Sequence, residues 1–204
     1  MSLALDALVL VGGVALARWI AGVVRRARRG PVNAAAARPS APNDPFAPFP
    51  CHLGDVVLRT TERQEAWLAA ALLFEEERPV GVLFVAPEAG GDRAVFVRDA
   101  AGGQLLWLAP IAPGELSLPR EPPHAIEHRG DRFERVRRTP VRVVRAGRDA
   151  PAVGDRAILA EYAGPAPAKI VLVAGDAQTL AWRGEALGPG EYDVLPGGEA
   201  TLRE

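Results

Sequence analysis

Short apolar runs separated by glycine, proline and Gly-Asp pairs fill the chain from Cys51 onward, a pattern typical of antiparallel β-structure. Many short strands in about 150 residues predict an all-β body. We divide it into a first part, 51–120, and a second, 121–204. The pattern leaves open whether these are two related small β-lobes or one barrel or sandwich. The nine predicted strands are 80–86, 94–99, 104–108, 133–137, 141–145, 157–162, 170–174, 179–182 and 192–195.

Two stretches depart from the simple strand pattern. In 61–77, Thr61 with Gln64 is a plausible helix start, yet the apolar run that follows fits a strand equally well. The family resemblance described below favours the strand. Pro140 lies inside another strand region and predicts an edge or a bulge there, because proline cannot donate to a ladder.

The first 29 residues differ from the rest, because the apolar stretch 3–24 runs directly into Arg25, Arg26, Arg28 and Arg29. A secretory signal peptide carries its positive charge before the apolar region, whereas here the arginines follow it. Positively charged flanks stay in the cytoplasm. We therefore expect 1–29 to be a single-pass anchor in the cell (inner) membrane, followed by a cytoplasmic body.

Arg18 decides between two forms of this anchor. A spanning helix needs about 20 mainly apolar residues, and 3–24 supplies 22 only if Arg18 is tolerated. Arg18 lies near the cytoplasmic end, where its side chain can reach the headgroups beside Trp19, and this favours a transmembrane helix. A membrane-surface helix held on anionic lipid by the arginines is the alternative.

Residues 30–50 contain six prolines and an alanine run, with little that could form a core. Because proline-rich chain is semi-extended, we predict a linker that separates the β-body from the bilayer. Phe46 and Phe49 are expected to pack on the body and fix the end of this linker.

Charge is divided unevenly along the chain. Residues 1–50 hold six arginines and two aspartates, a net charge of +4, so the remainder carries -5 of the overall -1. A mildly acidic body argues against a general nucleic-acid surface. Lys169 is the only lysine beside 23 arginines, which we attribute to genome base composition. A single cysteine, Cys51, excludes an internal disulfide and suits a reducing compartment.

A series of short motifs follows one order through residues 53–197. In that order they are Leu53 to Val57 with its Gly-Asp pair, Trp67, Trp107-Leu108, Gly130 to Phe133, Thr139 to Gly147, Glu161-Tyr162, Trp182 to Gly184 and Leu195-Pro196. This order resembles a bacterial family known as domain of unknown function 4178 (DUF4178). The resemblance implies an all-β cytoplasmic domain near membrane-associated systems, without an assigned reaction.

The sharpest catalytic candidate is the His-x-x-Glu-His sequence from His124 to His128, which has the order of one zinc peptidase class. That chemistry needs a helix to place both histidines on one face. Pro122 and Pro123 before the motif and Gly130 after it leave room for little more than a strand. In a strand Glu127 points away from both histidines. A partly exposed strand is therefore favoured over a metal-dependent hydrolase using His124 and His128.

The stretch 129–148 holds eight arginines, from Arg129 to Arg148, against two acids, and aromatic or aliphatic residues are interleaved with them. A nucleic-acid or phosphate binder would present such a face. Alternating charges on a solvated strand explain it as well, and we favour that interpretation. Trp67, Trp107 and Trp182 are expected in the core rather than in a ligand cage. The pair Cys51-His52 is expected to be structural, since no second cysteine exists.

Together these observations predict a membrane-tethered cytoplasmic β-domain that acts as a non-catalytic binding or adaptor module. The expected partners are inner-membrane lipid, through the anchor helix, and a membrane-associated protein. Neither a cofactor, a metal nor a nucleic acid is expected, and the oligomeric state is not predicted.

Overall fold

The computed structural model describes residues 44–88, 92–98, 104–116, 120–147 and 149–197. The chain separates into residues 1–37 and 38–204, and every described residue lies in the second unit. Twelve β-strands and no α-helix form within the described ranges, so the prediction of an all-β body is confirmed. The predicted anchor 1–29 lies outside them. Among the described residues no helix has the length and apolar character needed to cross a membrane.

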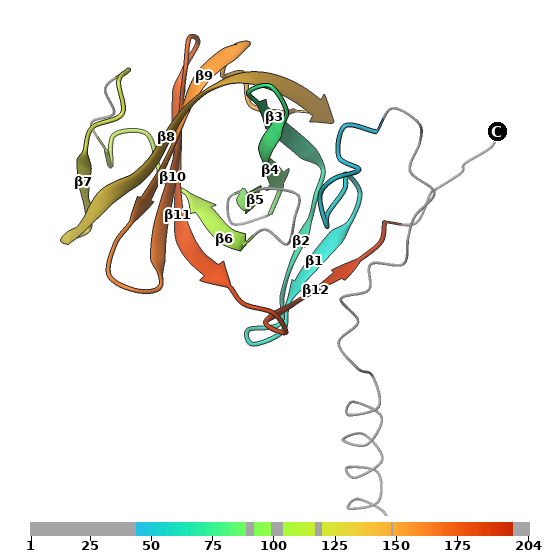
Figure 1. Ribbon diagram of the computed structural model, residues 1–204. Helices are drawn as coiled ribbons and strands as arrows, with labels where there is room; N and C mark the ends of the chain where they lie inside the picture. The colour runs from blue at the N-terminus through green and yellow to red at the C-terminus, as the bar shows by residue number, and fades with distance from the viewer. Residues whose placement is uncertain (1–43, 89–91, 99–103, 117–119, 148, 198–204) are drawn as a thin grey trace, which may run out of the picture. The chain divides into compact units, whose positions relative to one another are not determined.

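Eight strands close into an antiparallel barrel, which Figure 1 views along its axis. Each half of the chain contributes a four-stranded meander, and pairing of β6 with β11 and of β3 with β8 closes the ring. Of the alternatives left open by the sequence, the barrel is therefore the one that forms. The first meander is β3 (Ala70–Glu75), β4 (Pro79–Ala86), β5 (Arg93–Arg98) and β6 (Leu105–Pro110). The second is β8 (Asp131–Gly147), β9 (Arg156–Ala163), β10 (Ala168–Gly175) and β11 (Thr179–Leu187).

Apolar side chains from all eight strands fill most of the barrel interior. An eight-stranded barrel is just wide enough for its own side chains to pack inside, so this is a core rather than a channel. The largest contributors include Phe74, Leu83, Phe96, Leu108, Val143, Leu159, Val171 and Trp182.

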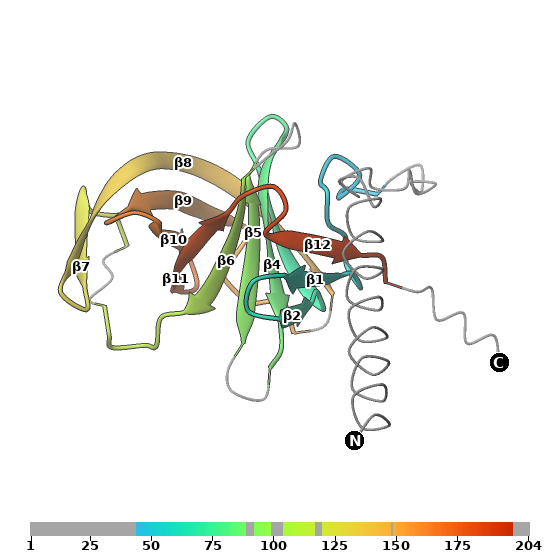
Figure 2. The same cartoon turned by 90° about the horizontal axis from the view of Figure 1, so that it is seen from below.

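Two further layers cover the outside of the barrel on opposite sides (Figure 2). A three-stranded sheet in the order β12-β1-β2 and the segment 44–53 pack on the first meander. β7 and the β6–β7 connection pack on the second meander. Both faces of the central strands are therefore buried, which explains their continuous apolar runs. The added strands are β1 (Val56–Arg59), β2 (Gln64–Trp67), β7 (Ala125–His128) and β12 (Tyr192–Leu195).

The predicted strands 133–137 and 141–145 are one strand of 17 residues, β8. It pairs in succession with β7, β9 and β3. Pro140 lies in the part of β8 that, among the described strands, pairs with β9 alone. The predicted edge position is therefore confirmed. The register shifts between Arg135 and Arg137, and this bulge leaves the Val136 side chain outside both apolar layers, 62% exposed.

The ambiguous segment 61–77 forms β2 and β3, so the strand prediction is confirmed. Residues Ala70 to Phe74 are all buried, alternately toward the barrel interior and toward the outer sheet. A helix would bury a single stripe of this run. The expected packing of Phe46 and Phe49 is also confirmed, because both are buried and the Phe46 ring lies 5.8 Å from that of Phe84.

Candidate functional site

The histidine motif lies on β7, which a two-residue turn joins to β8. Arg129 and Gly130 both have positive φ angles, 54° and 82°, as a type I′ hairpin requires. Ile126 and His128 are buried whereas Glu127 is exposed, so the predicted strand with Glu127 on the opposite face is confirmed. His124 precedes the strand and is exposed.

His128 is the centre of a half-buried polar network. Its Nε2 lies 3.1 Å from a Glu115 oxygen, and its Nδ1 lies 3.3 Å from Nη1 of Arg183. A guanidinium can only donate and a carboxylate can only accept. The ring therefore donates through Nε2–H to Glu115 and accepts at Nδ1. Both ring nitrogens are engaged.

Arg183 and Glu115 extend this network to neighbouring elements. The Arg183 Nη2 donates to Asp131 at 2.6 Å, and its guanidinium lies 5.1 Å above the Phe133 ring. Glu115 also accepts from Arg129 at 3.2 Å. The hydrogen bond from His128, with the nearby Arg129 charge, lowers the pKa of the Glu115 carboxyl. The network thus ties β7 and the β6–β7 connection to β11.

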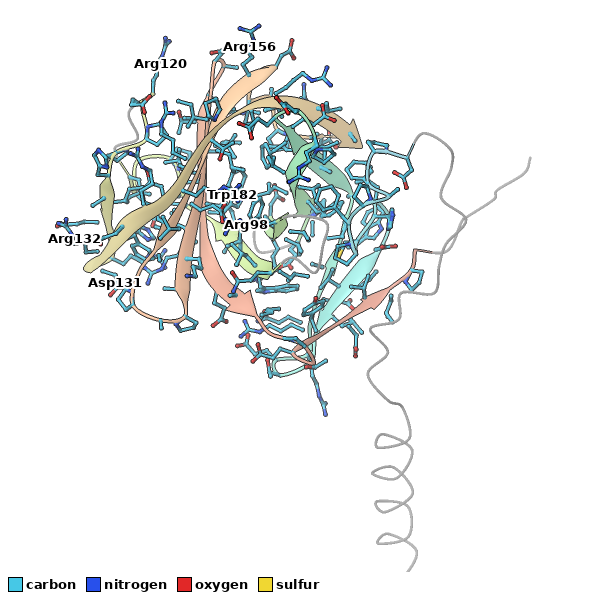
Figure 3. All side chains as sticks on the ribbon, in the orientation of Figure 1. Arg98, Arg120, Asp131, Arg132, Arg156 and Trp182 are labelled. Atoms are coloured by element: carbon cyan, nitrogen blue, oxygen red, sulfur yellow. The ribbon has the colours of Figure 1, made fainter. Side chains whose placement is uncertain are left out.

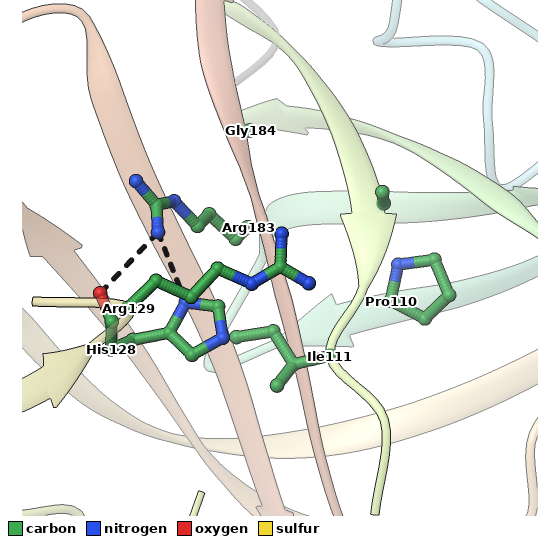
Figure 4. Close-up of a pocket in the computed structure, with 7 residues that line it drawn as sticks. Pro110, Ile111, His128, Arg129, Arg183 and Gly184 are labelled. Carbon is green, nitrogen blue, oxygen red and sulfur yellow. Dashed lines mark hydrogen bonds between the residues drawn. The ribbon is translucent and has the colours of Figure 1, made fainter. Parts of the chain in front are cut away.

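A pocket of about 250 Å³ opens beside this network (Figure 4). Each of its two arginines is already paired with a carboxylate, so the pocket carries little net charge. No lining residue has a hydroxyl or thiol that could act as a nucleophile. Among the described residues no group of three or more His, Cys, Asp or Glu side chains is placed to hold a metal ion. The lining residues are Ala109, Pro110, Ile111, His128, Arg129, Arg183 and Gly184.

The arginines of the stretch 129–148 are mostly paired. Five of the six described arginines on β8 reach a carboxylate or a carbonyl: Arg132 to Glu134, Arg135 to Pro122, Arg138 to Glu121, Arg142 to Glu75 and Arg145 to Ala150. Arg137 is the exception, with neither a hydrogen bond nor an ion pair to another described residue. Arg148 lies outside the described residues. Most of this face is therefore neutralised by the protein itself.

A charged group, the barrel-end cluster, occupies one end of the barrel interior; it consists of Arg98, Arg137, Glu161 and Lys169. Glu161 is 8% exposed, and its Oε1 accepts no hydrogen bond. The nearest cation is Nε of Arg98, 3.6 Å from that oxygen. Burial raises the pKa of Glu161, an effect opposed by the charges of Arg98, Arg137 and Lys169. Figure 3 shows Arg98 inside the ring of strands, next to Trp182.

Sequence reasoning missed this cluster, although a signal was present. Glu161 lies in an apolar run, in phase with Ala157 and Leu159, and strand alternation therefore directs it into the barrel interior. The three cations come from other strands.

A second surface stands out on the outer sheet. Trp67 is 58% exposed and Leu195 is 48% exposed. The expectation that Trp67 lies in the core is wrong, whereas Trp107 and Trp182 are buried as predicted. Ala66, the preceding residue of β2, faces the barrel, so Trp67 points outward, where no described layer covers it.

Cys51 and His52 have structural surroundings. Cys51 is fully buried, and burial raises the pKa of its thiol to about 12. His52 lies 3.6 Å from Asp44 and 3.8 Å from Asp55. The backbone N–H groups of His52 and Gly197 both donate to the buried Asp55 carboxylate, which joins the start of β1 to the end of β12.

The fold defines the chain as an eight-stranded antiparallel β-barrel protein with two outer layers. Comparison with models of protein families, with curated proteins and with solved structures finds no match. The predicted anchor flank lies outside the described residues, and its members are Arg18, Trp19, Arg25, Arg26, Arg28 and Arg29.

Proposed function

We propose that this protein is a non-catalytic binding module held at the cytoplasmic face of the cell membrane, and that it binds its protein partner through the outer sheet. The observation that carries the proposal is the row Trp67–Val56–Leu195. Val56 of β1 stands opposite Trp67 of β2 on one side and Leu195 of β12 on the other. Residues opposite one another in a ladder share a face, so the three side chains form one apolar row, in which Val56 is half-buried and Trp67 and Leu195 are exposed.

An exposed tryptophan in such a row is typical of a contact surface. Tryptophan is enriched among the residues that dominate binding energy, and clustered exposed apolar side chains mark interaction sites. The other two described tryptophans, Trp107 and Trp182, are buried. The exposure of Trp67 is thus specific to this sheet.

The next row indicates the chemistry of the partner. Leu58 of β1 stands opposite Glu65 on β2 and Asp193 on β12. Both acids are exposed, so two carboxylates lie beside the apolar row. A segment that presents apolar side chains together with lysine or arginine complements this surface in charge. We define the outer-sheet face as Val56, Leu58, Glu65, Trp67, Asp193 and Leu195.

The tether is the second part of the proposal. The apolar stretch 3–24 with its following arginines, and the proline-rich linker, would confine the barrel to the inner membrane surface. Confinement raises the effective concentration for membrane-associated partners without any new contact. The resemblance to the DUF4178 family, which remains a prediction from motif order, fits the same setting.

Two observations favour this function over the alternatives. Both nitrogens of His128 are engaged by Glu115 and Arg183, which leaves neither free to ligate a metal for a hydrolase. The outward arginines of β8 are paired within the protein, which weakens a phosphate-binding face.

The test is capture of partners from native membranes with the full chain, followed by quantitative mass spectrometry. Leu195→Glu places a carboxylate in the apolar row, the third on the outer-sheet face, and Val136→Glu is the matched control because Val136 is exposed elsewhere. The proposal predicts a membrane-associated protein that is retained by the wild type and by the Val136 variant and lost with Leu195→Glu. Equal retention by all three forms would contradict it.

A further inference from the structure

The barrel-end cluster brings side chains of four strands into the barrel interior. Glu161 alternates with interior residues of β9, and register places Arg137 directly opposite it on β8. Lys169 of β10 is in phase with Val171 and Val173, and Arg98 of β5 is in phase with Ala94 and Phe96, all four of which belong to the interior core.

Positive charge in this cluster exceeds negative charge by two when Glu161 is ionised. Arg98 forms the one ion pair, and neither Arg137 nor Lys169 has a hydrogen bond or ion pair to a described residue. Arg138, the neighbour of Arg137 that points outward, donates to Glu121 at 2.8 Å. Like charges held together in a half-buried site repel one another. An anion would relieve this repulsion.

Lys169 adds a chemical reason for a small anion. It is the only lysine of the chain, and the other 23 basic residues are arginines. A lysine ammonium is a compact point charge on a flexible stem, whereas a guanidinium is a wide planar fork. The interior position of the single lysine is therefore suited to a compact anionic group.

Glu161 indicates that the ligand is also a hydrogen-bond donor. Buried polar atoms almost always have a hydrogen-bond partner, yet the Oε1 of Glu161 accepts none. A ligand with a hydroxyl hydrogen would supply the missing donor. The Arg98 side chain is 40% exposed, so this end of the barrel is accessible to solvent.

We propose that the barrel-end cluster binds a small oxyanion that also carries a hydroxyl group, such as hydrogen phosphate or a 2-hydroxycarboxylate. The negative group lies between Arg137 and Lys169, and the hydroxyl donates to Glu161. A cation is disfavoured here by three positive side chains. The site is separate from the outer-sheet face and does not depend on the function proposed for that face.

Because Lys169 is the only lysine, an amine-acylating reagent modifies just two groups, Lys169 and the chain's amino terminus. The full chain in mild detergent is acylated in hydrogen phosphate, malate, succinate or chloride at equal ionic strength, and each rate is measured by mass spectrometry. We expect acylation of Lys169 to slow about tenfold when hydrogen phosphate or malate is at ten times its Kd, while the amino terminus is unaffected. Succinate, which lacks the hydroxyl, should protect less.

Variants connect the protection to the cluster. Arg137→Gln should abolish it, whereas Arg138→Gln, an outward arginine on the same strand, should leave it intact. Glu161→Met, which removes both side-chain oxygens, should remove the preference for malate over succinate. Vesicles containing phosphatidylglycerol form a second arm, and protection by these vesicles alone would support the site with a lipid headgroup as the source of the anion.

The proposal is overturned if neither free anions at about 10 mM nor the vesicles slow acylation of Lys169. It is also overturned if Arg137→Gln retains full protection. The circular dichroism and thermal midpoint of each variant show whether the barrel is intact.

Discussion

Trp67 and Leu195 lie on the two edge strands of the outer sheet, and both stand opposite Val56 on the strand between them. The next position, Val57, stands opposite Ala66 and Val194 and packs on the barrel. Strand alternation therefore gives this sheet one face that holds it on the barrel and one that is free to bind. Substitutions on the two faces should therefore have different effects on stability and on partner binding.

Trp67→Ala should leave stability nearly unchanged and weaken partner binding. An exposed side chain contributes within about 0.5 kcal/mol to folding, whereas a central interface tryptophan contributes about 2 kcal/mol or more, or ~30-fold in affinity. Trp107→Ala is the contrasting control, since this buried side chain should cost about 3–5 kcal/mol of stability. Chemical denaturation and binding to the captured partner separate the effects. Unfolding of Trp67→Ala as severe as that of Trp107→Ala would show that Trp67 is part of the core.

Glu161→Gln should stabilise the barrel near neutral pH. Burial raises the pKa of Glu161, so the folded state binds more protons than the unfolded state in the window above the ordinary carboxyl pKa. The free energy of unfolding therefore falls as pH rises through that window, and the glutamine variant should lack this loss.

Denaturant titrations at several pH values measure this effect. The advantage of Glu161→Gln should shrink on acidification to about pH 4, where carboxyl groups take up protons. Glu127→Gln, at an exposed strand position, serves as the matched control and should change little. Parallel pH profiles for Glu161→Gln and the wild type would refute the account of this buried carboxylate.

His128→Ala should destabilise the packing of β7 on the barrel. The substitution leaves Arg183 without its Nδ1 acceptor, and losing a buried hydrogen-bond partner costs about 1–3 kcal/mol. His124→Ala removes an exposed imidazole and should stay within about 0.5 kcal/mol. Equal losses of unfolding free energy for the two variants in urea titrations would show that the His128 network does not add to stability.

The hydrogen-bond network of His128 should change the pH dependence of stability in the sense opposite to that of Glu161. The hydrogen bond from His128 lowers the pKa of Glu115, so the stabilising contribution of this carboxylate is present above the ordinary carboxyl pKa. It is lost as pH falls through the lowered pKa. His128→Ala should therefore show a smaller acid-side loss of stability than the wild type, and an unchanged acid limb would contradict the assignment.

Cys51 reports on the segment 44–53 that covers the first meander. The thiol is buried and its pKa is raised to about 12, so the reactive thiolate is almost absent from the native state near neutral pH. Reaction with a disulfide reagent should be slow in native protein and fast in denaturant. Phe49→Ala removes a buried neighbour from this layer and should speed the reaction, while Val136→Ala should not. A fast native reaction would mean that the segment does not stay packed.

Local signals in the sequence located most of the strands, although β1 was not among those predicted. Glycine, proline and Gly-Asp pairs separate the apolar runs. Both halves of β8 were predicted as strands, but Pro140 made them appear to be two strands rather than one. Closure of the barrel was not predictable in this way. The pairings of β6 with β11 and of β3 with β8 join distant segments, and no local pattern encodes their register.

The candidate sites, too, were predictable only as far as local strand alternation determines them. Strand alternation placed Glu127 opposite the two histidines, but the partners of His128, Glu115 and Arg183, come from other elements. Trp67 was misplaced for a related reason, since alternation gives the two faces of a strand without telling which face another layer covers. Glu161 was overlooked because its cationic neighbours lie on three other strands.

The most direct test of the binding surface is site-specific photo-crosslinking from the full chain in native membranes. A photoreactive phenylalanine analogue replaces Trp67 in one form and Val136, another exposed apolar side chain, in the matched form. The account predicts a discrete crosslinked membrane-associated protein from position 67 and none from position 136. If position 67 gives no crosslinked species beyond those formed from position 136, the outer-sheet face is not the binding surface.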